Sequence, residues 1–487
     1  MTGLARSSPL QRPRVAHGPG CAGPGASVPS LFRFLAPERD GLATHHDHPV
    51  DTVPEDLPLP TGAPPPLSLR SNFSWTAAGN GTYALCQWLT LVVLAQLGSP
   101  SMVGRYALGL ALSTPIMTLA MMSLRQVLAT DARNQFDFFE YVDLRGVTTA
   151  LGLVVVGIAV VALGYDTGTA LVVCAVALSK AFDAVSDILW GLLQKRERMD
   201  TIAKSLIIRN VLSVIVLGAL VAATGSLLTG VIGSALCSAL VLVTYDQWVV
   251  RSAVAGSEDV RSPRAIVWHP RLTGNDAGRE RLVRLARLAL PLGLSTTLIS
   301  LHANIPRVFL ERSTGARELG LFSAMAYITI AGTTLVAALG QAGIPRMAAD
   351  VARGDWTAFN RLLVKMLAVA AALGIAGILG AALVGRRILF VLYGSDYARQ
   401  SDMFVWVMVA AAVHYLAVIL GHAITATRAF GRFLLPYVMV TVVAIAASAA
   451  LIPRFGIAGA TATLCVIAVA SCLAPLGILR MAKAAAS

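Results

Sequence analysis

The residue types that can do chemistry in this sequence gather in one apolar run, residues 168–193, which carries Lys180, Asp183 and Asp187. In a helix these three side chains would lie within about 60° of one another, on one face. Asp187 would lie about 10 Å beyond Lys180 along the helix axis. An ionisable group at the centre of a membrane-spanning helix costs at least ~2.5 kcal/mol, so a charged trio inside such a run is a candidate functional site.

Two interpretations of this trio are open from the sequence. The two carboxylates would share Lys180, and the negative charge of each should resist the ionisation of the other. Asp183 or Asp187 can then bind a proton or Na⁺ and couple that binding to a movement of the protein. Alternatively, the trio is a neutralising ion pair that only holds its helix to a neighbouring helix.

The composition shows what kind of element must position the trio. Of the 487 residues, 56% are hydrophobic and 13% are charged, whereas a soluble globular chain has about 25% charged residues. These values disfavour a soluble enzyme, a nucleic-acid-binding module and a disulfide-stapled secreted domain. The six cysteines form no C-x-x-C pair, and neither a phosphate-binding G-x-x-x-x-G-K-[ST] loop nor an H-E-x-x-H motif occurs. We expect no enzymatic activity, no cofactor, no metal site and no nucleic-acid partner.

From Phe73 onward, apolar runs of about twenty residues follow one another, each long enough to cross ~30 Å of hydrocarbon as a helix. They lack the alternation of a transmembrane strand, and only helices or closed barrels satisfy the backbone in lipid. The sequence therefore predicts an all-α polytopic membrane protein with twelve transmembrane helices. The predicted spans are 73–97, 103–124, 146–164, 168–193, 206–224, 227–249, 287–309, 317–343, 364–385, 402–426, 433–452 and 456–479.

The distribution of basic residues predicts the orientation. Counted over twelve spans, the loops on one side of the membrane, together with the C-terminus, hold 24 lysines and arginines, and the opposite loops hold 7. Basic residues accumulate in cytoplasmic loops, so both termini are predicted to be cytoplasmic. Residues 1–70 are rich in proline and glycine and are interpreted as a disordered cytoplasmic tail, or as a stretch that lies upstream of the true start codon.

The chain also resembles itself. Val103-Gly104-Arg105-Tyr106-Ala107 opens the second span, and Leu319-Gly320-Leu321-Phe322-Ser323 lies near the start of the eighth. Both halves would begin in the cytoplasm, which predicts a parallel repeat of two six-helix halves about a pseudo-two-fold axis along the membrane normal.

The predicted halves are residues 71–250 and 287–487, joined by a basic cytoplasmic linker, residues 251–286. The end of this linker has the pattern of an amphipathic helix on the anionic inner leaflet. A plain solvated linker is the alternative.

Short motifs along the chain resemble a known family. They are Lys180–Asp183, Trp190–Lys195, Arg198–Asp200, Ile305–Arg307 with Gly320, and Leu392–Tyr397. In this order and spacing they are similar to the bacterial Wzx-like oligosaccharide-lipid flippases of the multidrug/oligosaccharidyl-lipid/polysaccharide exporter superfamily. The resemblance covers about residues 70–482.

The resemblance implies a multi-pass protein of the bacterial inner membrane that moves undecaprenyl-pyrophosphate-linked oligosaccharide between leaflets by alternating access. The implied partners are the lipid-linked oligosaccharide, membrane lipid, and the glycosyltransferases and polymerase that act before and after the transfer. A polar cavity between the two halves would carry the sugar head. The alternative from the same superfamily is a cation-coupled multidrug or metabolite antiporter.

The candidate substrate-binding residues of such a protein are basic or amide side chains within the spans. Lys180 is one, and Arg307, beside His302 and Asn304, can bind pyrophosphate or an acidic sugar with bidentate hydrogen bonds. Alternatively, Arg307 extends towards the periplasmic interface.

Two further candidates, Arg209 and Asn210, lie at the start of the predicted fifth span, where they can meet the pyrophosphate at the cytoplasmic mouth. Arg209 is otherwise a positive-inside anchor. Asp246 is predicted to be solvated near the cytoplasmic end of the sixth span.

Overall fold

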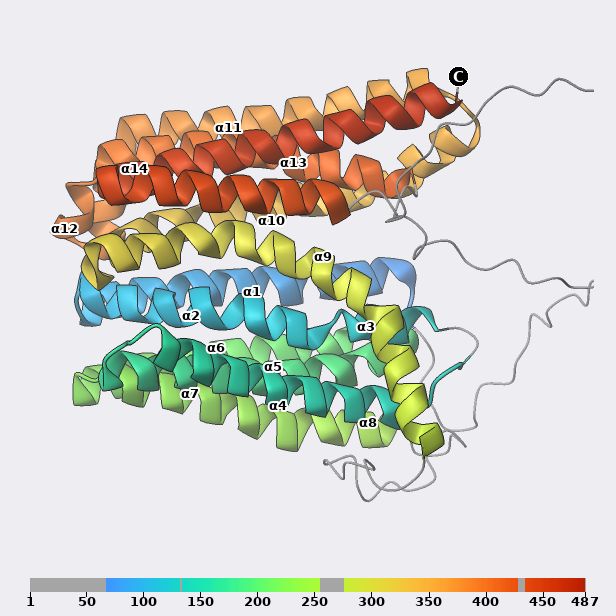
Figure 1. Ribbon diagram of the computed structural model, residues 1–487, viewed down its shortest axis with the longest axis horizontal. Helices are drawn as coiled ribbons and strands as arrows, with labels where there is room; N and C mark the ends of the chain where they lie inside the picture. The colour runs from blue at the N-terminus through green and yellow to red at the C-terminus, as the bar shows by residue number, and fades with distance from the viewer. Residues whose placement is uncertain (1–66, 132–133, 255–275, 428–433, 487) are drawn as a thin grey trace, which may run out of the picture. The chain divides into compact units, whose positions relative to one another are not determined.

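A computed structural model describes residues 67–131, 134–254, 276–427 and 434–486, and every regular element within these ranges is a helix (Figure 1). The predicted tail therefore lies outside the described residues up to residue 66. The centre of the predicted linker, residues 255–275, lies outside them as well.

The first half of the described chain contains eight α-helices and one π-helical turn. Their bounds are α1 (Leu69–Leu97), α2 (Pro100–Met121), α3 (Leu124–Thr130), α4 (Phe138–Ala162), α5 (Thr167–Lys195), α6 (Met199–Thr224), α7 (Leu227–Val241), the π-turn (Leu242–Asp246) and α8 (Gln247–Val254). The second half contains α9 (Asp276–Thr314), α10 (Ala316–Ala352), α11 (Trp356–Tyr393), α12 (Ser395–Ala398), α13 (Ser401–Ala426) and α14 (Leu434–Ala486).

Capping side chains explain where several of these helices begin. Asp137 and Glu140 form a reciprocal capping box at the start of α4, which satisfies backbone N–H groups that a helix start leaves free. Asp166 caps α5 by accepting the Thr169 N–H, and Ser99 caps α2 directly before Pro100. Proline suits this first helical position because it has no N–H to satisfy.

The short loop before α4 is ordered by Asp131, which accepts hydrogen bonds from the Gln135 and Phe136 N–H groups and from the Tyr141 hydroxyl. Partial burial alone would raise the pKa of Asp131. These three hydrogen bonds stabilise the carboxylate and hold its pKa below the usual range.

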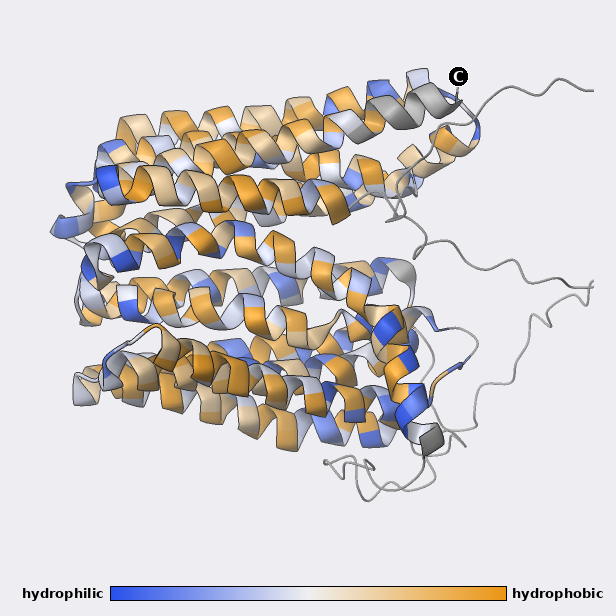
Figure 2. Ribbon diagram, viewed as in Figure 1, coloured by the Kyte–Doolittle hydropathy of each residue, from blue (hydrophilic) through white to orange (hydrophobic). Residues whose placement is uncertain are grey.

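Ten of the helices in the described part of the chain are long and apolar enough to cross a membrane. The predicted number was twelve. Helix α1 is not among the ten, and α14, at 53 residues, counts as one although Gly456 has non-helical backbone angles that divide it into two helices. Figure 2 shows apolar residues along most of the helical surface and polar residues at helix ends and at the start of α9.

The two halves repeat one packing pattern. In the first half, α1 packs on α6, α2 packs on α5, and α5 packs on α4 and α7. In the second half, α9 packs on α14, α10 packs on α13, and α13 packs on α11 and α14. Helices that hold the same place in the order of each half therefore make the same contacts. This supports the internal repeat inferred from the sequence.

The buried apolar side chains form one core shared by both halves and separate cores within each half. The shared core joins residues such as Leu94, Val103 and Val173 to Leu319 and Tyr393. It lies at the predicted periplasmic end.

At the predicted cytoplasmic end the cores are separate. One core contains Leu128, Tyr141 and Leu193 of the first half, and another contains Phe359 and Ile424 of the second. At this end the cores do not merge, and the second half reaches the first through α9.

Helix α9 differs from the prediction. The expected linker ran to residue 286, but α9 begins at Asp276 and continues without interruption to Thr314. Leu285 and Ala289 are fully buried in the core of the first half, and Arg281 forms an ion pair with Glu140 at 2.8 Å. Part of the apolar face of this segment therefore packs on the protein, while Val283 and Leu288 are 47% and 55% exposed, and its contact with the inner leaflet stays a prediction.

Candidate functional site

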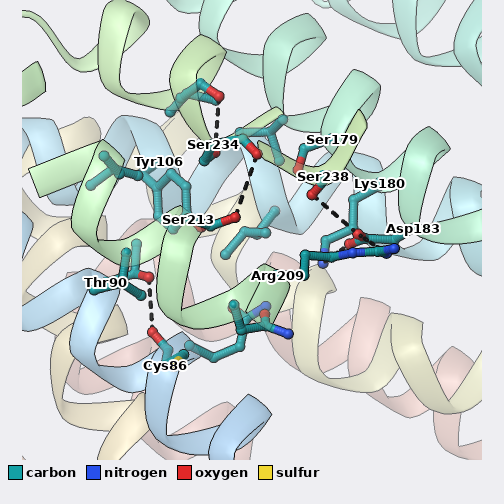
Figure 3. Close-up of a pocket in the computed structure, with 17 residues that line it drawn as sticks. Cys86, Thr90, Tyr106, Ser179, Lys180, Asp183, Arg209, Ser213, Ser234 and Ser238 are labelled. Carbon is teal, nitrogen blue, oxygen red and sulfur yellow. Dashed lines mark hydrogen bonds and ion pairs between the residues drawn. The ribbon is translucent and has the colours of Figure 1, made fainter. Parts of the chain in front are cut away.

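Within the first half, α1, α2, α5, α6 and α7 enclose a small polar pocket. The side chains that line it include hydroxyls, amides and charges: Cys86, Gln87, Thr90, Tyr106, Leu110, Val176, Ser179, Lys180, Asp183, Arg209, Asn210, Ser213, Val214, Leu217, Val231, Ser234 and Ser238 (Figure 3). The cavity volume is about 50 Å³, which is room for roughly three or four water molecules. The pocket can hold water or a small ion.

Arg209 is the centre of the charge network at this pocket. Its side chain is only 3% exposed. Its guanidinium donates to Asp183 Oδ1 at 3.0 Å, to Asp246 Oδ2 at 2.7 Å and to Ser186 Oγ at 2.5 Å. Asp246 also accepts from Ser205 Oγ at 2.5 Å. A buried cation is tolerated only when it is paired in this way, so the network fastens α6 to α5 and to the end of the π-turn.

The predictions for Arg209 and Asp246 were wrong in position. Helix α6 begins at Met199, so Arg209 lies well inside the helix and not at its mouth. Asp246 is 1% exposed and is not solvated. It ends a π-helical turn, an element that often marks functional sites and is not recognisable from hydropathy.

Asp183 and Lys180 lie next to Arg209 at the pocket wall. The Lys180 ammonium donates to Asp183 Oδ2 at 3.5 Å, and Ser238 Oγ donates to Asp183 Oδ1 at 3.4 Å. Asp183 is thus bound by two cations, and Arg209 is the closer. Asn210 also lines the pocket, but its side-chain N–H is donated to the Leu206 carbonyl.

Asp187 belongs to a second charge network, and the prediction that it shares Lys180 with Asp183 was wrong. Asp187 Oδ2 accepts from Arg145 at 3.0 Å, and Oδ1 accepts from Arg125 at 3.5 Å. Arg145 comes from α4 and is 1% exposed. Each carboxylate of the trio is therefore paired with its own arginine. These arginines come from other helices, so the sequence of one helix could not predict them.

Trp190 lies between the two networks. The guanidinium carbons of Arg125 and Arg209 lie 5.7 Å and 5.1 Å from its ring centroid, and its indole N–H donates to Asp246 at 3.4 Å. Such cation–π contacts stabilise partly desolvated arginines. The sequence argument missed Arg125 and Arg145 because both fall at the edges of the predicted spans, where an arginine is ordinary.

Arg307 of α9 is the candidate from the second half. Its guanidinium donates to Asn304 Oδ1 at 3.2 Å and lies 5.0 Å from the centroid of the Tyr327 ring. The described residues give it no carboxylate partner in a salt bridge, in contrast to Arg209. The neighbouring His302 is held by the Tyr437 carbonyl and the Thr441 hydroxyl.

Tyr327 lies on α10 in the shared core and carries Arg307 on its ring. Lys180, the candidate from the first half, lines the pocket of that half. Arg307 contributes a positive charge that no carboxylate among the described residues balances in a salt bridge.

Two solved membrane proteins have folds similar to that of this chain. The fold is similar to the lipid II flippase MurJ, with a TM-score of 0.67 at 12% identity, over 83% of this chain and 87% of that one. It is also similar to an inward-facing multidrug resistance MATE family transporter, with a TM-score of 0.60 at 15% identity, over 83% and 95% of the two chains. The chain is a multi-pass membrane protein whose fold is similar to the folds of these two proteins.

The particular family follows from the sequence match. Residues 69–349 match the model described as polysaccharide biosynthesis protein, and the chain belongs to that family. It is also 24% identical over 394 residues to the capsular polysaccharide biosynthesis protein CapF of Staphylococcus aureus, which covers 81% of this chain and 94% of the relative. The predicted resemblance to polysaccharide-biosynthesis flippases is confirmed.

Proposed function

We propose that the protein moves an undecaprenyl-pyrophosphate-linked oligosaccharide, a precursor of a surface polysaccharide, across the bacterial inner membrane. The family supports the substrate class. The observation that carries the transport mechanism is the distribution of the buried cores: the halves share a core at one end and have separate cores at the other. Halves that share a core at one end and are linked at the other through α9 can rock about the shared core, which gives alternating access to a site between them.

In this proposal both termini face the cytoplasm and twelve helices cross the membrane, with α1 and the two parts of α14 included. The end with separate cores then faces the cytoplasm, where the lipid-linked sugar is made. The sugar head enters between the halves while the polyprenyl chain stays in the bilayer. No extended lipid tail has to be accommodated in the small pocket of the first half.

Lys180 and Arg307 are the proposed substrate contacts. A guanidinium binds a phosphate group with two parallel hydrogen bonds, and an ammonium adds a point charge. Arg307 lies over the ring of Tyr327, and Lys180 lines the pocket of the first half. Arg209 and Asn210 line the pocket beside Lys180, so we assign them to the support of Lys180 rather than to direct contact at the mouth.

Ion coupling at Asp183 and Asp187 stays a prediction. A coupling cation at either carboxylate would have to displace or weaken an arginine, because Arg209 and Arg145 both contact them at 3.0 Å. Proton binding to Asp183 would release Lys180 and loosen Arg209 from α5. A small polar pocket at this carboxylate is the observation that favours such coupling.

The test is a deletion of the gene in its own bacterium. We expect lipid-linked repeat units to accumulate on the inner leaflet and surface polysaccharide to be lost, with recovery by the wild-type gene and not by Arg307→Ala. Normal surface polysaccharide in the deletion strain would contradict the proposal. A deletion strain that keeps its surface polysaccharide but loses resistance to toxic cations would favour the antiporter alternative.

A further inference from the structure

Helices α2 and α10 cross at the predicted periplasmic end in contact through their backbones. A Cβ atom added to Gly104 would lie 1.7 Å from the Ala316 carbonyl oxygen, and one added to Gly320 would lie 1.9 Å from the Pro100 carbonyl oxygen. Both obstacles are main-chain atoms that no side-chain rotation can move. Only glycine fits at these two positions while the helices are in this contact.

The contact is reciprocal. Each glycine meets the carbonyl that lies four residues before the other glycine, Pro100 before Gly104 and Ala316 before Gly320. A self-complementary contact of this kind is what a two-fold axis produces between identical surfaces. The crossing therefore lies on the pseudo-two-fold axis of the repeat, at the point where the two halves meet most closely.

The surroundings of the crossing are tightly filled. Every residue of α10 from Leu319 to Tyr327 is buried, which means that the helix has no exposed face over more than two turns. Such all-round burial occurs only inside a packed core. The same stretch supplies Leu319, Phe322 and Met325 to the core shared by both halves.

Hydrogen bonds between the halves accompany the crossing. The Trp88 indole N–H donates to the Tyr393 hydroxyl at 2.9 Å, and that hydroxyl donates to the Ala324 carbonyl at 3.1 Å. Gln96 donates to the Leu392 carbonyl at 2.9 Å. These contacts close the same end of the molecule with directional bonds that break if the halves separate.

We propose that the Gly104–Gly320 crossing is the gate that closes the substrate path at the predicted periplasmic end, and that the missing Cβ atoms are what permit the closed state. The inference rests on the proposed transport function, because a gate is needed only if a substrate passes. A methyl group at either glycine would keep α2 and α10 apart. Such a variant would populate the state that is open at this end.

The test uses the full-length protein in proteoliposomes, with its natural cysteines replaced and a single reporter thiol introduced by Ser323→Cys. Ser323 is fully buried one turn beyond Gly320, and the structure gives its hydroxyl no hydrogen-bond partner, so the exchange is a mild one. A membrane-impermeant maleimide is added from either side. We expect the reporter to be protected, and to react at least tenfold faster once Gly104→Ala or Gly320→Ala is added.

Gly157→Ala is the matched control, because Gly157 lies in α4 with no atom within 4 Å of an added Cβ. We expect this substitution to leave the reporter protected. Unchanged labelling in both gate variants, in protein that stays monodisperse with a wild-type melting temperature, would overturn the proposal. The labelling needs no substrate, so it tests the gate even if the passenger is not a lipid-linked oligosaccharide.

A second experiment covers the case in which the gate variants do not fold. Gln96→Cys and Leu392→Cys are joined by a short, reducible thiol crosslinker across the same closed end. We expect oligosaccharide-lipid transport to fall at least tenfold on crosslinking and to return on reduction. Full transport in a sample that is more than about nine-tenths crosslinked would overturn the gate and leave the transport function standing.

Discussion

The two halves share a packing pattern but differ in what they bury. The first half holds two charge networks, in which Arg209 and Arg145 pair with carboxylates of α5. The corresponding helix of the second half, α13, has no aspartate, glutamate, lysine or arginine after Asp402. The ion pairs described within the second half, Arg284–Glu280, Arg317–Asp396 and Arg353–Asp350, lie at or near helix ends.

The two halves therefore have matching helix contacts but different buried charges. The charge networks fix α4, α5 and α6 against one another, so we interpret the first half as a rigid body with a preorganised lysine at its surface. The second half offers Arg307 with an amide and an aromatic partner only, which leaves its charge available to a substrate. A rigidly held Lys180 in the first half, and an Arg307 in the second half without a salt-bridge partner among the described residues, suit a substrate that binds between the two halves.

The largest effect is expected from breaking the network of the first half. Asp246→Ala would leave Arg209 with one carboxylate fewer in a buried site, and removing a partner of a buried pair costs about 3–5 kcal/mol. We expect a strongly lowered melting temperature in detergent. Asp396→Ala, in the exposed pair of the second half, is the control and should cost about 0–1 kcal/mol. Equal melting temperatures for the two variants would contradict the contrast.

A smaller effect on stability and a large effect on transport are expected at Arg307. Arg307→Ala removes no salt bridge that the structure shows, so the melting temperature should change little. Transport should fall at least tenfold, because a bidentate phosphate contact is lost. Arg307→Lys should recover part of the rate, since the charge remains but the paired hydrogen bonds do not. A wild-type rate for Arg307→Ala would remove Arg307 from the site.

An intermediate effect is expected for the contact between the halves. Trp88→Phe keeps the ring and deletes the N–H that Tyr393 accepts, while the Tyr393 hydroxyl keeps its own acceptor, the Ala324 carbonyl. The net loss should be about 1 kcal/mol. It should appear as faster maleimide labelling of the Ser323→Cys reporter. Labelling that slows would show that this bond does not hold the closed end together.

The smallest effect is expected in the loop before α4. The pKa of Asp131 is lowered in the folded protein, so its carboxylate stabilises the loop above the unfolded pKa of about 3.9 and ceases to do so as the pH falls through the lower folded value. Asp131→Asn should therefore speed amide exchange at Gln135 and Phe136 at pH 7. The difference from wild type should vanish at low pH, and a difference that persists there would point to packing instead.

The sequence was sufficient for the class of fold, and the internal repeat stays a prediction that the matched helix contacts favour. Apolar runs of fixed length and the matched Gly104 and Gly320 are local patterns, and the structure pairs these two glycines at one crossing. The partners of the charged trio could not be predicted, because Arg145 and Arg209 reach α5 from other helices. The π-turn that buries Asp246 and the extension of α9 into the first half also depend on tertiary packing, which overrides local hydropathy.

The most direct test of the central claim is a leaflet-exchange measurement with purified protein. An undecaprenyl-pyrophosphate oligosaccharide is incorporated into proteoliposomes, and a membrane-impermeant glycosidase or lectin reports how much of it reaches the outer leaflet with time. The account predicts fast exposure of the protected fraction with wild-type protein, and a rate at least tenfold lower with Lys180→Met or Arg307→Ala. Exposure at the protein-free rate with correctly folded wild-type protein, in the presence and absence of proton and sodium gradients, would contradict it.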